Sequence, residues 1–403
     1  MSAVKLICAS RVAGSLGAAV TAASLLVGVA NAQPQISSVM SFEVETVAEG
    51  LVNPWSMAFL PNGDMLVTEK AGSLRLVRNG RLLDTPVAVI DDVRDAGQGG
   101  LHDVVLHPNF AANNLVYLSY ARGNADKSLG TTALVRGRLQ NDRLVDIEEI
   151  FEAVAWDSTP GHFGARVAFD GNGHLFMSVG DRMAGFEPGG FTKDLEGHPA
   201  QNPSNHQGTI VRLTLDGDVP SDNPFVGRDG FLPEIWSYGH RNPQGLVFDS
   251  ATGKLWETEH GPQGGDELNE ILPGRNYGWP VIGYGANYSV GTEIHMARAR
   301  EGMEQPAAFW VPSIAVSGLA IYHGDEFDNW EGNLLVGGMS GQHRRLSRVM
   351  VNEDSTVTNR EALLSGTYRI RDVRVGPDGL IYLATDNQFG NATAIVRLVP
   401  AED

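Results

Sequence analysis

The sequence predicts an all-β fold, namely a six-bladed β-propeller with four-stranded antiparallel blades. First, one pattern recurs six times: an alternating strand, a turn rich in Pro, Asn, Asp or Gly, and a second alternating strand. Second, helical periodicity is absent after the N-terminal segment. Third, one lone strand remains at each end of the repeats. Hairpins repeated at this spacing are typical of propellers.

The six hairpins set the expected order of the blades. They cover residues 57–67, 103–120, 166–179, 245–259, 319–336 and 372–385. The lone strands, 41–47 and 393–399, are expected to pair within one blade and so to close the ring. A two-sheet sandwich is the alternative architecture. Six similar hairpins favour radial repetition, because it protects the edges of the sheets.

The N-terminal segment, residues 1–32, is expected to be a signal peptide. Lys5 and Arg11 form a short positive region, residues 12–29 are apolar and small, and Ala30-Asn31-Ala32 is a cleavage signal. An uncleaved membrane anchor is the alternative, and the small residues and the cleavage signal argue against it. The single cysteine of the sequence lies in this segment, so no disulfide is expected in the mature chain. The propeller is then expected to be a single domain, 38–403.

The composition limits which binding partners and which cellular compartment are expected. The 403 residues carry a formal net charge of -18, and the pI is about 5.0. Because no basic cluster stands out, nucleic acid and anionic membranes are not expected as partners. No second apolar run is long enough to span a bilayer. Together with the signal peptide, this predicts a periplasmic or secreted protein.

The stretch 240–284 concentrates polar residues around the fourth hairpin. After its return strand we expect an irregular loop, because Gly261-Pro262 and Gly264-Gly265 break regular structure. Backbone carbonyls and carboxylates in one loop are hard oxygen ligands, which suit calcium. A solvated acidic loop is the alternative. His240, just before the hairpin, is expected to hydrogen-bond turn backbone, as is His107.

A second candidate site surrounds His162 and Asp181. His162 precedes the third hairpin and Asp181 follows it, and the entry and exit of one hairpin are adjacent, so the two side chains are expected to face each other. A carboxylate raises the basicity of an imidazole and holds its tautomer, as a general base for a hydroxyl proton requires. A purely structural pair is the alternative. Neither zinc-ligand spacing nor a G-x-S-x-G motif occurs.

Arg241, Arg369 and Arg371 are a cationic group in an acidic protein, and all three precede hairpins. Residues that enter the innermost strands converge on the central channel of a propeller. Guanidinium groups bind carboxylates through bidentate hydrogen bonds, so a polycarboxylate ligand would fit between these arginines and calcium. Arginine–aspartate pairing within blades, with residues such as Asp372, is the alternative.

Several longer motifs make a family resemblance specific. The chain resembles the soluble PQQ-dependent sugar dehydrogenases of the glucose/sorbosone dehydrogenase family, most closely the aldose sugar dehydrogenase branch. The motifs are NPWSMAFLPNGDMLVTE, GQGGLHDVVLHPNF, HFGAR, VGDR, SNHQGTIVRL, GHRNPQGL, EHGPQGGDELN, NYGWP and RIRDVRVGPDGLIYLATD. They cover almost the whole mature chain, and the resemblance likewise implies a six-bladed propeller.

The resemblance implies a function: oxidation of aldose sugars at C1 to lactones, dependent on PQQ and calcium. It implies that His162 takes the proton of the C1 hydroxyl while hydride passes to PQQ. Asp181 then supports His162, and Gln98 lies near the quinone and the substrate. A quinone or a cytochrome is expected as the electron acceptor. A calcium-dependent lactonase and a non-catalytic sugar-binding propeller are the alternatives.

The resemblance also implies the ligand-binding residues. Those expected at PQQ are Arg241, Asn242, His260, Ser313, Arg369 and Arg371. Gly261 and Pro262 are expected to give carbonyl ligands to the calcium that also holds PQQ. Glu267 is expected at a second, structural calcium, with carbonyls near Tyr284. Two departures from the glucose dehydrogenases stand out: residues 337–342 contain no lysine, and His260 replaces a glutamine.

Overall fold

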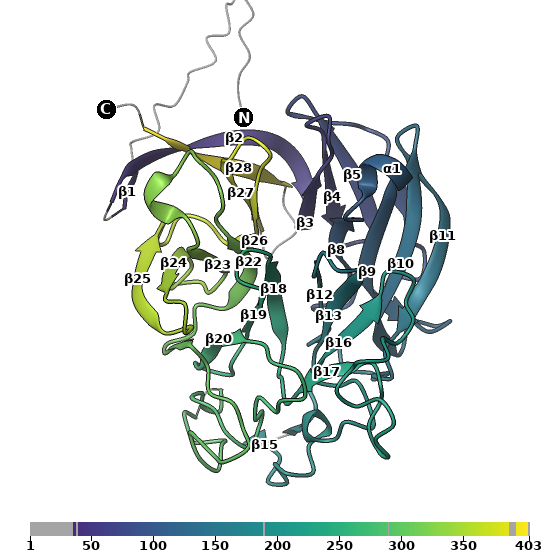
Figure 1. Ribbon diagram of the computed structural model, residues 1–403, viewed down its shortest axis with the longest axis vertical. Coiled ribbons are helices and arrows are strands. Elements are labelled where there is room, and N and C mark those ends of the chain that lie inside the picture. Colours follow the sequence, from purple (N-terminus) through teal and green to yellow (C-terminus); the bar gives the residue numbers. More distant parts are fainter. Residues whose placement is uncertain (1–34, 38, 188–189, 289, 387–391, 402–403) are drawn as a thin grey trace, which may run out of the picture. The chain divides into compact units, whose positions relative to one another are not determined.

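Six antiparallel sheets surround a common centre, so the fold is the predicted six-bladed β-propeller (Figure 1). The computed structural model describes residues 35–401 except 38, 188–189, 289 and 387–391. The expected signal peptide therefore lies outside the described residues. Contacts group Pro34–Asp403 into one compact unit. Within the described part of the chain, no helix combines the length and apolar character needed to cross a membrane.

The first three blades follow one another along the chain, and their strands are given from the centre outward. Blade 1 contains β3 (Pro54–Phe59), β4 (Met65–Glu69), β5 (Ser73–Arg78) and β6 (Arg81–Leu82), with β7 (Ala88–Val89) paired to β5. Blade 2 contains β8 (Leu101–Leu106), β9 (Leu115–Gly123), β10 (Gly130–Gln140) and β11 (Arg143–Glu152). Blade 3 contains β12 (Gly164–Phe169), β13 (His174–Val179), β16 (Thr209–Thr214) and β17 (Ile235–Tyr238).

The last three blades complete the ring. Blade 4 contains β18 (Pro243–Asp249), β19 (Lys254–Glu259), β20 (Asp266–Glu270) and β21 (Ala308–Trp310). Blade 5 contains β22 (Val316–Ile321), β23 (Leu334–Gly338), β24 (Leu346–Val351) and β25 (Val357–Leu363). Blade 6 contains β26 (Ile370–Val375), β27 (Ile381–Thr385), β28 (Ala392–Pro400), β2 (Ser41–Val52) and β1 (Gln35–Ile36). The pairing of β2 with β28 confirms the predicted closure by the two ends of the repeats.

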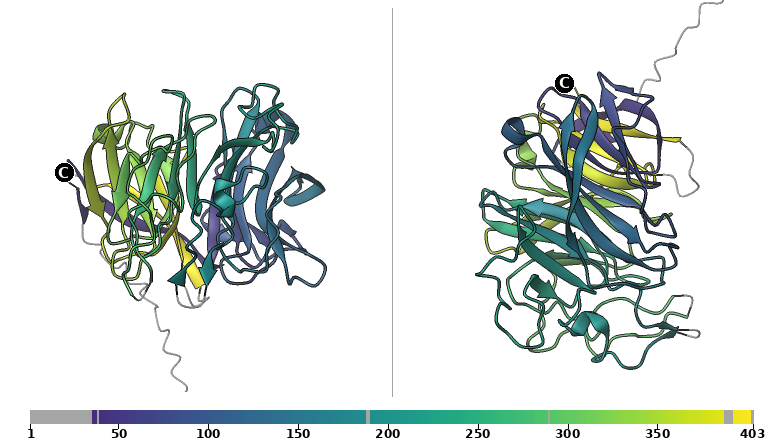
Figure 2. Two further views of the ribbon diagram at one scale, coloured as in Figure 1. Left: turned by 90° about the horizontal axis from the view of Figure 1, so that it is seen from below. Right: turned by 90° about the vertical axis from the view of Figure 1, so that its right-hand side faces the viewer.

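Short elements occupy the connections between the strands. They are α1 (Phe110–Asn113), the 3₁₀ turns η1 (Pro199–Gln201) and η2 (Asp328–Trp330), and the small sheet of β14 (Phe186–Glu187) and β15 (Gly190–Phe191). The long connections that follow β13 and β20 lie side by side at one end of the ring in both Figure 1 and Figure 2. An ion pair between Arg300 and Glu196 joins these two connections.

All six predicted hairpins are present, but each innermost strand begins two or three residues before its predicted start. The cause is a register shift at the same place in every blade. The shifts lie between Pro54 and Ser56, Leu101 and Val104, Gly164 and Val167, Pro243 and Gly245, Val316 and Leu319, and Ile370 and Asp372. A bulge leaves an extra residue unpaired and interrupts alternation, so the periodic pattern is recognisable only after it.

One sequence expectation about blade 4 was wrong. Residues 266–270 were expected in an irregular polar loop, but they form β20, which pairs with both β19 and β21. The strand reads Asp-Glu-Leu-Asn-Glu and lacks the usual alternation of apolar and polar residues. Asp266 and Asn269 are nevertheless buried, because their side chains bond to other polar groups. Burial of polar groups in the tertiary structure therefore makes this segment a strand, although its composition predicts a loop.

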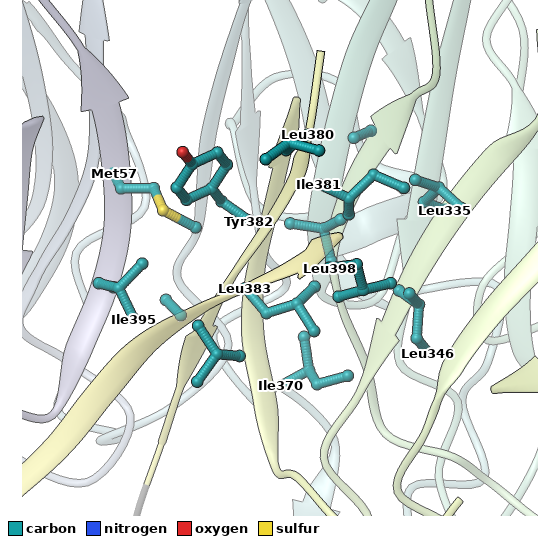
Figure 3. Close-up of a cluster of buried hydrophobic side chains, with 14 of the residues drawn as sticks. Met57, Leu335, Leu346, Ile370, Leu380, Ile381, Tyr382, Leu383, Ile395 and Leu398 are labelled. Atoms are coloured by element: carbon teal, nitrogen blue, oxygen red, sulfur yellow. The ribbon is translucent and has the colours of Figure 1, made fainter. Parts of the chain in front are cut away.

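Neighbouring blades pack through apolar faces. The largest cluster joins Met57 of blade 1, Leu335 of blade 5, and Leu383 and Ile395 of blade 6 (Figure 3). All four side chains are almost fully buried. Because this cluster spans the blade in which both ends of the propeller pair, hydrophobic burial helps hold the ring closed.

Charged side chains bind the innermost strands together at the centre. Arg166 of β12 donates to Asp103 of β8 at 3.1 Å and to Asp372 of β26 at 2.9 Å. Arg374 donates to the same two carboxylates at 2.7 and 2.9 Å. Ser56 of β3 donates to Asp103 at 2.5 Å. We call these five residues the central network; it connects blades 1, 2, 3 and 6.

Replacing Arg166 should therefore destabilise the whole propeller. Arg166, Asp103 and Asp372 are at most 2% exposed. Loss of the guanidinium leaves buried carboxylates undercompensated, so we expect Arg166→Met to lower the free energy of unfolding by roughly 3–5 kcal/mol. Urea unfolding measures the change.

The exposed pair of Arg138 and Asp146 provides the control, because its charged groups are 3.9 Å apart and largely solvated. Arg138→Met should change the free energy by less than about 0.5 kcal/mol. If Arg166→Met and Arg138→Met lower the free energy of unfolding equally, the central network stabilises the fold no more than an exposed ion pair does.

Candidate functional site

A polar cavity of about 400 Å³ lies at the end of the ring where the innermost strands begin. Every blade contributes to its wall. The lining residues are Asn53, Pro54, Trp55, Lys70, Gly97, Gln98, His102, Phe163, Gly164, Asn242, Gln244, His260, Ala315, Met339, Arg369, Arg371 and Asp386. Four of them, Trp55, His102, Gln244 and Arg371, stand at the register shifts. The bulges therefore turn side chains from the ladders towards the cavity.

His162 and Asp181 lie beside this cavity and contact each other. The entry of β12 and the exit of β13 bring His162 Nδ1 to 2.6 Å from Asp181 Oδ1. Asp181 also accepts hydrogen bonds from the Trp279 indole at 2.7 Å and the Met183 backbone N–H at 2.9 Å. With Nδ1–H donated to the carboxylate, the lone pair of the imidazole is on Nε2. No described residue hydrogen-bonds to that nitrogen.

The backbone at His162 has an unusual conformation. Its φ is +50°, in the left-handed region that residues other than glycine seldom adopt. The conformation is held by Gln98, whose Oε1 accepts the His162 backbone N–H at 2.9 Å. A Cβ on Gly180 would lie 2.2 Å from the His162 carbonyl oxygen, so this close approach requires glycine. A held non-glycine residue in this region is characteristic of functional sites.

The electrostatics keep His162 neutral and Asp181 charged. Burial, followed by the nearby Arg241 guanidinium, lowers the pKa of His162 below its ordinary 6.5. For Asp181, burial opposes ionisation, but the interactions with His162 outweigh it, and the pKa is below its ordinary value. Burial and the neighbouring Arg241 also hold the pKa of His260 well below its ordinary value. At neutral pH, His162 is thus an unprotonated base beside an ionised carboxylate.

Cations gather on one wall of the cavity. Arg369 and Arg371 both pair with Asp386, at 3.3 and 3.0 Å. The within-blade pairing considered from the sequence is therefore present, but its carboxylate is Asp386 instead of Asp372. Lys70, from blade 1, is the third cationic side chain among the described lining residues.

A second, much smaller cavity of about 20 Å³ adjoins His260, which lines both cavities. Gly261, Pro262, Glu267 and Tyr284, the predicted metal-binding residues, all line it. Its volume is enough for one atom of the size of a water oxygen.

Arg241 lines the small cavity and not the large one. Its guanidinium donates to the carbonyls of His260 and Gly261, both at 3.0 Å. The Gly261 carbonyl thus already has a partner, contrary to the expectation of free carbonyls in this loop. No described residue donates a hydrogen bond to the Pro262 carbonyl.

Three glutamates meet next to the small cavity. Glu257, Glu259 and Glu267 lie around one amide, that of Asn269, whose Nδ2 is 3.0–3.4 Å from each carboxylate. Burial, and then the charge of Glu259, raise the pKa of Glu257 and Glu267 well above the ordinary value. Glu257 Oε1 has no hydrogen-bond partner among the described residues. This carboxylate cluster has the chemistry of a site for a hard cation.

His240 belongs to the same cluster. Its ring nitrogens, Glu257 and Glu259 place ligand atoms within 4.8 Å of one another. His240 contacts Ser237 Oγ at 2.9 Å and Glu259 Oε1 at 3.4 Å, so the expectation that it bonds turn backbone was wrong. His107 does accept the Asn109 backbone N–H, at 2.8 Å, as predicted.

The predicted ligand-binding residues thus divide between the two cavities. Gln98, Asn242, His260, Arg369 and Arg371 line the large one. Ser313 does not line it: its hydroxyl donates to Asp266, at 2.8 Å from either carboxylate oxygen. Asp266 in turn accepts the Gly261 backbone N–H at 3.1 Å, so Ser313 helps to order the loop.

Sequence analysis missed several wall residues, above all Trp55, Lys70, His102 and Asp386. Trp55 lies in the bulge of β3, and Asp386 directly follows β27. Both therefore stand at the entry or exit of a hairpin, as the predicted residues His162 and Asp181 do. Equivalent positions in the six repeats were therefore the available signal.

His102 is buried in the wall as a neutral ring. It packs against Trp55, with ring centroids 4.9 Å apart, and its Nε2 lies 3.2 Å from the Gln98 carbonyl oxygen. Burial lowers the pKa of His102 to about 3, and the charges of Arg371 and Lys70 act in the same direction. His102 thereby helps to position the Gln98 segment that holds His162.

Comparison with known proteins places the chain among sugar dehydrogenases. Residues 51–397 match the family described as Glucose / Sorbosone dehydrogenase. The chain is 41% identical to aldose sugar dehydrogenase YliI of Escherichia coli, over 86% of this chain and 91% of that protein. It is 27% identical to quinoprotein glucose dehydrogenase B of Acinetobacter calcoaceticus, over 86% of each chain. The PQQ-bound aldose sugar dehydrogenase of Streptomyces coelicolor matches with a TM-score of 0.70, 28% identity, and coverage of 89% of this chain and 98% of that one.

His102 should make the stability of the protein depend on pH. In the folded protein His102 stays unprotonated down to about pH 3, whereas in the unfolded chain its imidazole binds a proton below about pH 6.5. The contribution of His102 to the free energy of unfolding is therefore fully present above pH 6.5 and falls as the pH is lowered towards 3. Between pH 7 and pH 5, His102→Gln should lose about 2 kcal/mol less unfolding free energy than the wild type. Urea unfolding at both pH values tests this.

His323 provides a control of opposite sign. Its contacts with Glu331 and Asp249 outweigh the effect of burial and raise the pKa of His323, so protonation there favours folding at low pH. His323→Gln should therefore steepen the loss of stability on acidification. Parallel pH profiles for the wild type and His102→Gln would contradict the prediction.

Proposed function

The chain belongs to the glucose/sorbosone dehydrogenase family, and from this premise we propose that it oxidises aldose sugars at C1 to lactones with PQQ and calcium. The observation that carries the proposal is the neutral His162, oriented by an ionised Asp181 beside a polar cavity. PQQ is supported by the PQQ-bound relative from Streptomyces and the quinoprotein from Acinetobacter. A quinone or a cytochrome as electron acceptor, and export to the periplasm or medium, remain predictions.

The large cavity suits a polycarboxylate cofactor. Lys70, Arg369 and Arg371 carry three positive charges, which pair with Asp95 and Asp386, so a surplus of one positive charge remains. This surplus stands in a chain with a net charge of -18. Asn242 accepts hydrogen bonds from Gly164 N and Gln244 Nε2 with its side-chain oxygen, so its amide N–H groups are free to donate to a ligand. Arginine and amide donors are the groups that hold carboxylates.

The small cavity and the glutamates beside it suit calcium. Glu267 lines the cavity, and the buried carboxylates of Glu257 and Glu259 stand close by. Glu257 and Glu267 form no ion pair with any described cationic side chain. A divalent cation would stabilise the ionised form of these carboxylates, with Glu267 as a ligand and carbonyls near Tyr284 completing the shell. Gly261 and Pro262 keep their proposed role as carbonyl ligands next to PQQ.

The residues of this chain divide the chemistry among themselves. PQQ, when bound, supplies the acceptor for the electron pair of the sugar C1–H bond. His162 Nε2 receives the proton of the C1 hydroxyl as that bond breaks, and the product is the lactone. Asp181 keeps the proton on Nδ1 and stabilises the imidazolium that results. Trp279 fixes Asp181, and Gln98 fixes the backbone of His162.

Removal of the base should stop the reaction without unfolding the protein. We expect His162→Ala to lower kcat by about 10²–10⁴-fold, and Asp181→Asn to lower it less, because Asp181 orients the ring. The measurement is dye reduction by PQQ-loaded protein at saturating aldose. Because the pKa of His162 is below 6.5, wild-type activity should decline on acidification only below that pH.

A second His–Asp pair in the same hairpin offers a matched control. His174 Nδ1 lies 2.8 Å from Asp170 Oδ2 at the turn, far along the strands from His162. His174→Ala should leave kcat unchanged. Retention of wild-type kcat by His162→Ala would assign the base elsewhere, and lactone hydrolysis without PQQ would favour a lactonase instead.

Calcium should stabilise the protein through Glu267. A ligand that binds only the folded state at about 100 times its Kd adds about 2.7 kcal/mol of stability. We therefore expect calcium to raise the Tm of the chelator-treated wild type, and Glu267→Gln to lose most of that rise. Chelator should also abolish reconstitution with PQQ.

Glu270 is the control on the same strand, because it contacts Lys254 and Ser355 instead of the carboxylate cluster. Glu270→Gln should keep the calcium-dependent rise in Tm. Calcium is excluded as a resident ion if the wild-type Tm and PQQ uptake are the same with calcium and with chelator.

A further inference from the structure

Arg182, the last residue of the VGDR motif, is a buried cation that lines neither cavity. It directly follows Asp181, and it is 0% exposed. Burial lowers the pKa of Arg182 to about 10, so the guanidinium is still charged at neutral pH. Among the described residues, no carboxylate forms an ion pair with it. Because a buried charge without a counter-charge is costly, its other contacts must explain why it is there.

The guanidinium of Arg182 contacts backbone carbonyls and an aromatic face. Its two terminal nitrogens donate to the carbonyls of Gly161 and Thr159, the second at 2.8 Å. Its central carbon lies 3.5 Å from the centroid of the Phe163 ring, as in a cation–π contact. In return, the Thr159 hydroxyl donates to the Arg182 carbonyl. One side chain therefore contacts both chain neighbours of His162, Gly161 before it and Phe163 after it.

The backbone of Arg182 is attached to the same place. Its N–H donates to the His162 carbonyl at 3.2 Å. Both residues have a φ in the left-handed region, +56° for Arg182 and +50° for His162. Residues other than glycine seldom adopt this conformation, and it persists only where the surrounding contacts determine it. The contacts of Arg182 are thus part of what keeps His162 in its unusual conformation.

The chain that leads into His162 depends on such contacts throughout. Residues 158–162 belong to no strand, so their carbonyls have no ladder partners. Arg94 donates to the carbonyls of the first two residues, at 2.7 and 2.9 Å, and the Gln98 backbone N–H donates to that of the third at 2.7 Å. Of these donors and Arg182, only Arg182 reaches the carbonyl directly before His162 and that of His162 itself.

The charge of Arg182 also acts on the imidazole of His162. Burial makes the largest contribution to the low pKa of His162, and the positive charges of Arg241 and Arg182 act in the same direction. Asp181 opposes them, and His260 is the other titratable group close by. Because carbonyls surround the Arg182 guanidinium, where a carboxylate would have cancelled its charge, that charge still acts on the ring.

We infer that Arg182 is a positioning residue for the proposed oxidation: it fixes the backbone on both sides of His162, so that the imidazole faces Asp181 and the large cavity together. The inference rests on the proposed function, in which His162 is the base. A guanidinium that paired with a carboxylate would have fewer N–H groups left for the carbonyls, which accounts for the missing ion pair.

Three substitutions separate positioning from general stability. Arg182→Met removes the charge and both N–H contacts, and it should lower kcat of PQQ-loaded protein roughly 10- to 100-fold, because small displacements of a reacting group are costly. Arg182→Lys keeps the charge but not the planar fork of donors, so it should lower kcat less. Arg212→Met is the matched control: Arg212 is a buried arginine of the same blade and lies 5.0 Å from the Trp236 ring. It should lose stability and keep kcat.

The titration of His162 is a second measurement, which needs neither PQQ nor sugar. In protein with isotope-labelled histidine, NMR follows the imidazole from about pH 8 to about pH 4, and the signal missing in His162→Ala identifies it. Arg182→Met removes a nearby positive charge, so the pKa of His162 should rise by roughly 0.5–1. The acid limb of the kcat profile should move to higher pH with it. Arg182→Lys and Arg212→Met should leave this pKa unchanged.

The outcomes are distinct. If folded Arg182→Met keeps both the wild-type kcat and the wild-type titration of His162, Arg182 serves stability alone and the inference is overturned. If Arg182→Met does not fold, a folded Arg182→Lys with wild-type kcat overturns it equally. A wild type that oxidises no aldose refutes the proposed function, whereas the titration of His162 in the wild type and in Arg182→Met still decides the role of Arg182.

Discussion

The central network is the constraint on which the rest of the propeller depends. Innermost strands converge on an axis where water is scarce, so a charged side chain there needs a partner from another blade. Arg166 finds two, Asp103 and Asp372, and its guanidinium also lies 4.2 Å from the ring of Trp55. Arg166 Nε donates to the carbonyl of Gln244 as well. One buried cation therefore connects blades 2, 3, 4 and 6 and supports two residues of the cavity wall. Ring closure and the shape of the site have a common origin.

The repeated register shift explains how a regular fold builds an irregular site. In a regular ladder, every residue of an innermost strand would pair with a residue of the adjacent strand. The register shift leaves one or two residues per blade out of the ladder near the strand entry, and in blades 1, 2, 4 and 6 one of them lines the cavity. The repeats thus offer equivalent positions, and the chemistry differs because Trp55, His102, Gln244 and Arg371 occupy them. Function is placed on the scaffold without disturbing the outer strands of the blades.

The two cavities are coupled through Arg241 and Glu259. Glu259 accepts the backbone N–H of Arg241 at 2.5 Å, and the side chain of Arg241 reaches the carbonyls of the Gly261 loop. Arg241 also contributes to the low pKa of His162. The charge in the glutamate cluster and the protonation of His162 are therefore physically linked. A cation beside the glutamates would stabilise the segment that keeps His162 neutral.

The sequence by itself determined the six hairpins and the contact of His162 with Asp181, because strand alternation and hairpin adjacency act over about twenty residues or fewer. It also predicted the closure of the ring, because one unpaired strand was left at each end of the repeats. It misassigned residues 266–270, because only tertiary burial turns such a polar run into a strand. Tertiary structure alone decided which side chains from different blades meet, such as Arg166 with Asp103 and Asp372. These partners are joined by the geometry of the closed ring, and no local pattern records distances across it.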